Sequence, residues 1–333
     1  MSGLTIIDEY IRFLEENFRP RRYRVSAVVA SKEAVDACNR LSAWVSEYEC
    51  SVLFVEGLDK SISVSVDYRE PWYRSVVDVS ELFREHRLYA DVLVLVAEFN
   101  RREEVPVFYQ IAREYKRKYP WGRVILFAVT PSPGAAIEYK ALAYSLIRES
   151  SLKNVVDAII VLDPRRLAEL NGLSLNGTLV YRFGGLGEII GAIVSGDVFL
   201  RELERWKDKR VWEIASLLGV SIAIYGSLAN LFRTLEFGLL TTPWSWRSDV
   251  LALILRAEPK VNIRMDDLRL SFSEWASKKF EKLVSVIIDY GKAGGGVRRV
   301  TVILLGRLSS EAESEVLGSL EKAFKEYIGG FQP

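Results

Sequence analysis

Two turns of this sequence carry the side chains that could bind phosphate. Ser31 and Lys32 follow one short apolar run, and Arg101 and Arg102 follow another. Hydroxyl, ammonium and guanidinium groups at the end of a buried strand are typical donors to phosphate oxygens in α/β proteins. These two turns are therefore the first candidates for an anion-binding site.

Neither turn contains the glycine that a backbone phosphate cradle needs. Glycine lets the N–H groups at a helix N-terminus approach phosphate oxygens, where the helix dipole adds positive partial charge. Residues 30–34 read ASKEA, and residues 98–106 also lack glycine. Glu33, Glu103 and Glu104 would repel phosphate, and no G-x-x-x-x-G-K-[ST] motif occurs in the chain. Charged turns that face solvent are the simpler interpretation.

Other reactive residue types are sparse. The chain has one histidine and two cysteines among 333 residues, which argues against histidine-based catalysis, a zinc site or a disulfide framework. Its 45 basic and 44 acidic residues give a formal net charge of +1. Such a balance does not favour nucleic acid as a partner. We expect neither a metal site nor a nucleic-acid interface.

The composition and the N-terminus predict a cytoplasmic protein. No apolar run reaches the length of a transmembrane segment. Residues 1–18 have the pattern of an amphipathic helix with acidic residues and differ from a signal peptide. Charged residues make up 27% of the chain, and it has only two methionines. Many ionic and few thermolabile side chains are typical of a thermophile.

Short apolar runs alternate with amphipathic helices through the N-terminal half. We expect strands at 23–30, 51–55, 61–66, 90–97, 123–130 and 156–162, and helices at 32–48, 79–86, 107–119, 134–148 and 164–170. Near-continuous apolar strands between amphipathic helices indicate a parallel sheet with helices on both faces. The predicted class is α/β, with a Rossmann-like N-terminal sheet.

The second half reads as a long helix followed by a smaller α/β domain. Residues 171–197 are glycine-rich and resemble a loose connection. Residues 198–238 read as a long, mostly helical segment in which residues 207–209 are a candidate break. Strands are expected at 251–255, 285–289 and 299–305, and helices at 273–283 and 310–327. The predicted units are an N-terminal helical extension (1–22), a nucleotide-binding-like α/β domain (23–197), a central helical segment (198–240) and a C-terminal α/β domain (241–333).

One loop of the second half is rich in aromatic residues. Trp244 and Trp246 lie two positions apart, and Arg247 follows them. Tryptophan and arginine dominate the energetics of protein–protein interfaces. A packed loop between domains and a protein–protein contact both fit this pattern, and both interpretations remain open.

The order of these elements resembles the tubulin/FtsZ superfamily. Residues 28–41 (VVASKEAVDACNRL) are similar to that family's first strand, first phosphate loop and following helix. Residues 90–114 (ADVLVLVAEFNRREEVPVFYQIARE) resemble its next conserved strand, glycine signature loop and helix. Residues 119–146 are similar to the tubulin segment around V-x-P-S-P, and residues 237–250 resemble the loop after the long central helix. The final strand and helix, 300–327, also fit the family's C-terminal domain.

The resemblance implies a fold and shows departures at the nucleotide site. In the family, the first loop and the glycine signature loop hold the phosphates of a guanine nucleotide. The loop after the central helix supplies an acidic residue to the neighbouring subunit's nucleotide, and here Trp244, Trp246 and Arg247 occupy that region. The implied nucleotide-loop positions are degenerate, and we carry over no catalytic residue. These positions are Ser31, Lys32, Asn39, Arg101 and Arg102, and Asn39 alone keeps a fitting residue type.

The resemblance implies a divergent, archaeal, non-catalytic relative of tubulin and FtsZ. Such a pseudo-GTPase would act through protein–protein contacts as a scaffold or regulator in cytoskeletal assembly, cell division or membrane remodelling. Its partner would be a second copy or a tubulin/FtsZ-like homologue, and the loops give no support for GTP or GDP as a cofactor. Two alternatives remain open. One is a polymerising GTPase with diverged phosphate loops, and the other is an unrelated Rossmann-like α/β protein.

Overall fold

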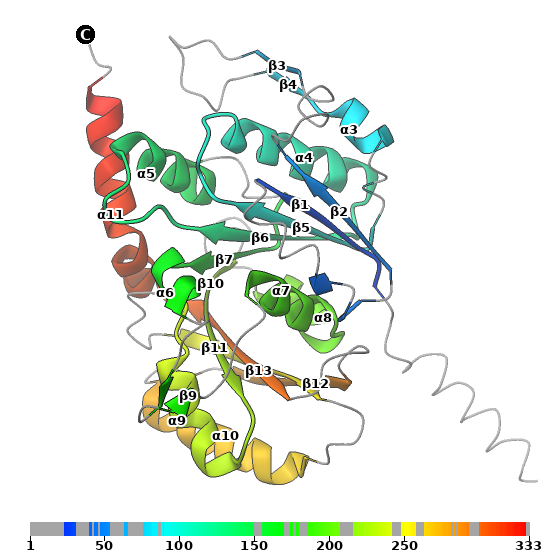
Figure 1. The fold of residues 1–333 in the computed structure, drawn as a ribbon, viewed down its shortest axis with the longest axis vertical. Helices are drawn as coiled ribbons and strands as arrows, with labels where there is room; N and C mark the ends of the chain where they lie inside the picture. Colours follow the sequence, from blue (N-terminus) through cyan, green and yellow to red (C-terminus); the bar gives the residue numbers. More distant parts are fainter. Residues whose placement is uncertain are drawn as a thin grey trace, which may run out of the picture.

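The computed structural model describes most of the chain between residues 23 and 330. The described residues are 23–30, 40–41, 43–45, 47–53, 63–65, 76–85, 88, 90–149, 155–169, 174–175, 178–179, 185–206, 216–241, 248–257, 263–280, 283, 285–292 and 300–330. Within them, one sheet of nine strands runs through both halves of the chain in the order β12-β11-β13-β10-β7-β6-β5-β1-β2 (Figure 1).

Six strands form the parallel part of this sheet. Each pairs in parallel with its neighbours among the six. The strands are β1 (Val25–Val29), β2 (Tyr48–Val52), β5 (Val92–Ala97), β6 (Arg123–Val129), β7 (Ala158–Leu162) and β10 (Ser216–Ile224). The predicted parallel sheet is confirmed, because near-continuous apolar strands suit a sheet that is covered on both faces.

Three further strands extend the sheet beyond β10. β13 (Thr301–Leu308) is antiparallel to both β10 and β11 (Ser248–Ala257), and β12 (Ser285–Lys292) pairs in parallel with β11. Two small hairpins lie outside this sheet. They are formed by β3 (Ser63–Ser65) with β4 (Val76–Asp78) and by β8 (Ser174–Leu175) with β9 (Thr178–Leu179).

Helices cover both faces of the sheet (Figure 1). They are α3 (Ser80–Glu85), α4 (Glu104–Lys118), α5 (Ile137–Tyr144) with a π-helical turn after it (Ser145–Glu149), α6 (Pro164–Glu169), α7 (Leu186–Val194), α8 (Val198–Trp206), α9 (Leu228–Phe237), α10 (Met265–Lys279) and α11 (Ser310–Gly329). No helix in the described residues has both the length and the apolar character of a membrane span.

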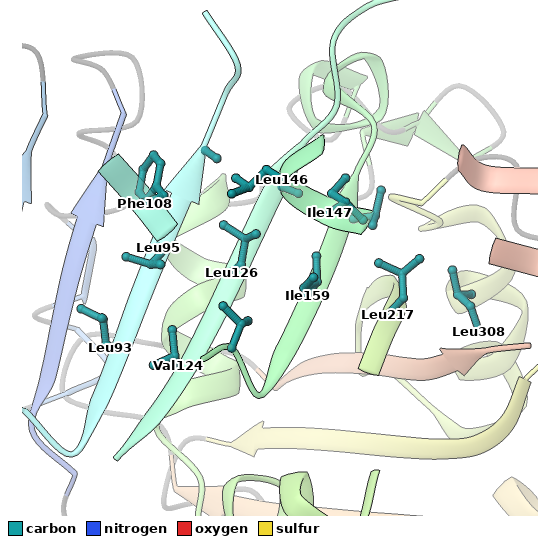
Figure 2. Packing of buried hydrophobic residues seen from close by; sticks show 14 of the residues in the cluster. Leu93, Leu95, Phe108, Val124, Leu126, Leu146, Ile147, Ile159, Leu217 and Leu308 are labelled. Carbon is teal, nitrogen blue, oxygen red and sulfur yellow. The ribbon is translucent and has the colours of Figure 1, made fainter. Parts of the chain in front are cut away.

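Alternate residues of each strand enter two separate cores, because successive side chains of a strand point to opposite faces. Leu93, Leu95, Val124 and Leu126 pack on one face with Phe108 of α4 (Figure 2). Side chains of α3, α5, α9, α10 and α11 complete this core. The intervening residues of β5 and β6 pack on the other face against α7 and α8.

The expected long helix over residues 198–238 is wrong. α8 ends at Trp206, β10 occupies Ser216–Ile224, and α9 begins only at Leu228. All side chains from Leu217 to Ala223 are buried, as suits a strand with neighbours on both edges and cores on both faces. A short, wholly apolar run cannot be assigned to helix or strand from periodicity alone. The supposedly loose region 171–197 also contains a helix, α7.

Helix α7 packs so closely against the segment around Trp44 that Gly191 has no room for a side chain. A Cβ at this position would lie 2.4 Å from Cγ of Trp44 and 2.8 Å from its Cβ. Both Gly191 and Trp44 are buried on the same face of the sheet. The contact therefore sets the distance between α7 and the segment around Trp44.

We expect Gly191→Ala to lower the free energy of unfolding by about 1–3 kcal/mol, because the added methyl group overpacks this contact. Gly318→Ala in α11 is the matched control, since nothing lies within 4 Å of a Cβ built at Gly318. The control should raise stability by about 0.5–1 kcal/mol, the helix preference of alanine over glycine. Urea unfolding followed by circular dichroism measures both. A stable Gly191→Ala variant would contradict the close packing.

Candidate functional site

The carboxyl ends of β1 and β5 lie side by side at the point where the strand order reverses. β1 pairs with β2 on one side and with β5 on the other, and Val29 lies opposite Val96. Just beyond this pair, the backbone N–H of Ala30 donates to the carbonyl of Val96 at 3.0 Å. Open α/β sheets bind ligands at such a switch point. The structure thus brings together the starts of the two turns that the sequence singled out.

The described residues include only part of the predicted site. Arg101 and Arg102 lie in the loop between β5 and α4, at the switch point. The other candidates lie outside the described residues, so their roles stay predictions. These are Ser31, Lys32 and Asn39 of the first turn and Trp244, Trp246 and Arg247 of the expected interface.

The loop between β5 and α4 folds around the carboxylate of Glu104, the first residue of α4. Oε2 accepts hydrogen bonds from the backbone N–H groups of Glu98 at 3.0 Å and Phe99 at 2.7 Å. Oε1 accepts from the backbone N–H groups of Asn100 at 2.6 Å and Arg101 at 3.1 Å. Four successive N–H groups therefore converge on one side chain.

This arrangement is buried and conformationally demanding. Glu104 and Phe99 are each 1% exposed. Phe99 has a φ of 58°, in the left-handed region that few non-glycine residues adopt. Left-handed residues turn successive N–H groups toward a common point and create an anion-binding nest. In this loop the anion is a carboxylate of the chain itself.

Burial raises the pKa of the Glu104 carboxyl, and the four N–H donors oppose that rise. Burial disfavours the charged form, whereas each donor favours it. Burial is the larger of the two effects. Glu104 therefore binds a proton more readily in the folded chain than in the unfolded chain.

We expect the contribution of Glu104 to stability to depend on pH with a definite sign. The folded-state pKa lies above the ordinary value of 4.5, so the folded chain takes up the proton first as the pH falls. The share of the free energy of unfolding that this group contributes should rise as the pH falls from the folded-state pKa to 4.5, and decrease on the return. Urea unfolding of the wild type and Glu104→Gln between about pH 4 and pH 7 measures the difference. The opposite slope would contradict the raised pKa.

Arg102 is engaged by a neighbouring helix. Its Nε donates to Oε1 of Glu138, in the first turn of α5, and forms an ion pair with that carboxylate. Burial and then the charge of Glu138 raise the pKa of the Tyr327 hydroxyl on α11. The loop, α5 and α11 therefore meet at this corner (Figure 1). Arg101 contributes its backbone N–H to Glu104, and its side chain is exposed.

A second carboxylate at the same edge of the sheet is also held by hydrogen bonds and an ion pair within the chain. Asp163 follows β7 directly, and its Oδ1 accepts from the backbone N–H of Arg165 at 2.9 Å. The guanidinium of Arg165 pairs with the same carboxylate at 2.7 Å. In the part of the chain that the structure describes, no group of three or more His, Cys, Asp and Glu residues could hold a metal ion.

The sequence alone missed the role of Glu104. It marked the residue as one that repels phosphate, but not as the acceptor that organises the loop. A usable signal was present, because Pro106 favours the first turn of a helix and so places Glu104 near the N-terminus of α4. An acidic side chain in that first turn can reach back to free N–H groups, as in a capping box.

Comparison with known proteins places the fold. No family model and no curated protein sequence matches the chain. The structure is similar to GDP-bound monomeric CetZ1 from Haloferax volcanii, with a TM-score of 0.59 and 16% identity over 92% of this chain and 99% of that one. It is also similar to CetZ from Methanosaeta thermophila strain DSM 6194, with a TM-score of 0.58 and 13% identity over 92% and 93%. CetZ proteins are archaeal members of the tubulin/FtsZ family, and the chain therefore has the tubulin/FtsZ-like fold.

Proposed function

We propose that this chain is a tubulin/FtsZ-like protein that does not hydrolyse nucleotide and that acts through protein–protein contacts. It would serve as a scaffold or regulator of a cytoskeletal assembly, in cell division or membrane remodelling. One observation carries the proposal. The backbone N–H groups that a phosphate would need at the β5–α4 loop are hydrogen-bonded to Glu104.

Charge repulsion opposes the binding of a phosphate beside the carboxylate of Glu104. Two unit negative charges about 4 Å apart repel by about 4 kcal/mol at an effective dielectric constant of about 20, which weakens binding about a thousandfold. Moving Glu104 aside would remove its four hydrogen bonds and expose a side chain that is 1% accessible. Either course opposes phosphate binding at this loop.

The comparison with CetZ1 supports the view that nucleotide binding was lost through changes in the β5–α4 loop, and that the fold itself was kept. The CetZ1 structure is described as GDP-bound, so a protein of this fold can hold a nucleotide. In the present chain, residues 98–103 lack glycine, and Glu104 fills the nest that they form. We propose that the change lies in the loop and that the docking surfaces of the fold remain in use.

The main alternative is a GTPase that polymerises and holds its nucleotide through side chains. The exposed side chain of Arg101 at the switch point favours it. The ion pair between Arg102 and Glu138 argues against it, because a phosphate would compete with a carboxylate already in place. The other alternative, an unrelated Rossmann-like protein, has little support beside a tubulin/FtsZ-like match over 92% of the chain.

Isothermal titration with GTP and GDP in the presence of Mg²⁺ tests the proposal. We expect no heat of binding at micromolar nucleotide. Micromolar affinity would overturn the non-catalytic assignment. An Arg101→Ala/Arg102→Ala double variant then decides between mechanisms, since loss of that affinity would support the side-chain alternative.

Sedimentation and negative-stain microscopy test the scaffold role. We expect self-association, or association with a tubulin/FtsZ-like homologue, that is the same with and without GTP. A chain that stays monomeric in both mixtures would overturn the scaffold role.

We also propose that the protein works in the cytoplasm of a thermophilic archaeon. A thermal unfolding midpoint typical of mesophilic proteins would contradict the thermophilic part of this proposal.

A further inference from the structure

The nine-stranded sheet has two edge strands, which differ in length and in charge. β2 ends the sheet on one side and β12 ends it on the other. β2 has five residues and carries Glu49 in its interior. β12 has eight residues, and among the described strands only β11 pairs with it (Figure 1). The outer side of β12 therefore presents backbone N–H and C=O groups with which no described strand pairs.

β12 lacks the features that commonly protect an edge strand from pairing with another chain. These features are short length, charged side chains and proline. The strand reads SVIIDYGK, without proline, and its one charged residue before the last position is Asp289. That residue is 2% exposed, and its carboxylate pairs with Arg256 of β11. The middle of β12 therefore presents no free charge that would repel a further strand.

One face of β12 carries an apolar strip of three side chains. Successive side chains of a strand point to opposite faces, so Val286, Ile288 and Tyr290 share one face. Val286 and Ile288 are partly buried against the core on that face, and Tyr290 is 39% exposed. Ile287 packs against the core on the other face, where Asp289 accepts a backbone hydrogen bond from α8. A further strand beside β12 would bury what remains exposed of the strip.

We propose that β12 pairs antiparallel with β12 of a second copy of this chain, about a two-fold axis at Ile288. The two sheets then form one continuous sheet. This inference rests on the self-association in the proposed function, and it names the surface that associates. With this axis, Val286 of one copy lies opposite Tyr290 of the other, and Ile288 lies opposite its own counterpart.

The side-chain pattern of β12 selects this axis. Residues opposite each other in an antiparallel pair share a face, so a two-fold axis perpendicular to the sheet passes through a residue. The axis at Ile288 pairs a β-branched residue with an aromatic ring twice and with another β-branched residue once, and such pairs are favourable. An axis at Asp289 would place two carboxylates opposite each other. An axis at Ile287 would leave Tyr290 opposite a residue beyond the end of β12.

Other occupants fit this edge less well than a second β12. The other edge strand, β2, is shorter and would bring Glu49 into the pairing. An unrelated extended peptide could also add to the edge through its backbone. A second β12 already has the complementary sequence, because the valine of each copy meets the tyrosine of the other. An isologous contact of this kind closes at two copies and leaves the rest of each surface free.

Sedimentation equilibrium of the full chain without nucleotide tests the proposal. We expect a reversible dimer. Ile288→Lys should weaken it at least tenfold, because two lysines would then face each other across the axis at about 5 Å. Ile288→Glu should weaken it to a similar degree for the same reason. An equimolar mixture of the two variants should restore the dimer, since each lysine then faces a glutamate.

A second variant tests the strip at a side chain that is already exposed. Tyr290→Lys should fold normally and weaken the dimer about tenfold, because it removes both aromatic pairs. Trp121→Lys is the matched control. Trp121 is 72% exposed, and four strands separate β12 from β6, the strand that follows Trp121. This control should dimerise like the wild type, and circular dichroism melts check that each variant is folded.

Three results would overturn the proposal. A chain that is monomeric alone but associates with a tubulin/FtsZ-like homologue would remove the dimer and leave the proposed function intact. Equal dimerisation by Tyr290→Lys and Trp121→Lys would place the contact on another surface, again without affecting the proposed function. Folded Ile288→Lys and Ile288→Glu variants that do not recover on mixing would exclude the axis at Ile288. Micromolar binding of GTP would count against the proposed function alone.

Discussion

Glu104→Ala should lower the free energy of unfolding by about 3–5 kcal/mol, because four N–H donors lose their acceptor at once. A buried donor without a partner costs about 1–3 kcal/mol. The N–H of Phe99 is buried, and those of Glu98, Asn100 and Arg101 are partly buried. Water can recover part of the loss for the last three. Urea unfolding of the wild type and the variant measures the difference.

Two controls show whether the carboxylate itself matters. Glu104→Gln keeps the size and one acceptor oxygen but turns an amide N–H₂ toward N–H donors, so we expect an intermediate loss of about 1–3 kcal/mol. Added formate should raise the unfolding midpoint of Glu104→Ala and leave the wild type unchanged, since a small carboxylate fits the vacated nest. An unaffected Glu104→Ala variant would remove the observation on which the proposed function rests.

The second large effect is expected at a buried ion pair between β11 and β12. Arg256 is 0% exposed, and its guanidinium contacts both carboxylate oxygens of Asp289 at 3.1 Å. Nε of Arg256 donates to the carbonyl of Ala192 at 2.9 Å and to Oγ of Ser195 at 3.0 Å. Asp289 in turn accepts from the backbone N–H of Phe199 at 3.1 Å. The pair thus holds the ends of α7 and α8 against the sheet.

Asp289→Ala should lower the free energy of unfolding by about 3–5 kcal/mol, because it leaves the Arg256 charge buried without a partner. Arg256→Met should have an effect of the same order. The double variant Arg256→Met/Asp289→Leu should lose less than the sum of the single changes, since it buries no unpaired charge. A double-mutant cycle in urea measures the coupling.

Additive losses would contradict this view of the pair, because they would mean that the two charges do not depend on each other. Gly196 offers a further check on the same contact. A Cβ there would lie 1.6 Å from Nη2 of Arg256, so Gly196→Ala should disturb the pair without removing either charge. The loss of unfolding free energy caused by Gly196→Ala should largely disappear when it is combined with Arg256→Met.

Most regular elements of this fold could be read from local pattern. The apolar runs that become β1, β5, β6 and β7 and the amphipathic segments that become α4, α5 and α11 were all expected near their observed bounds. Each is a strong periodic signal, either a short wholly apolar run or an apolar stripe at helical spacing. The absence of glycine from residues 98–106 was equally visible, because it is a property of composition.

Three features depended on tertiary contacts between distant residues. Residues 216–224 became a strand, not part of a helix, because β7 and β13 provide partners on both of its edges. Glu104 became the acceptor of four N–H groups because the left-handed turn at Phe99 closes the loop over it. Val25 and Arg123 came to lie level with each other because their strands flank β5.

The turn after β5 shows which features the sequence determined and which features only the tertiary structure determined. Residue types and spacing were enough to establish that this turn lacks a glycine cradle and carries repelling acids. The tertiary structure decided that one of those acids fills the place of the anion. A local pattern reports which side chains are apolar or charged, whereas the direction of a backbone N–H group depends on how the whole loop packs against its neighbours.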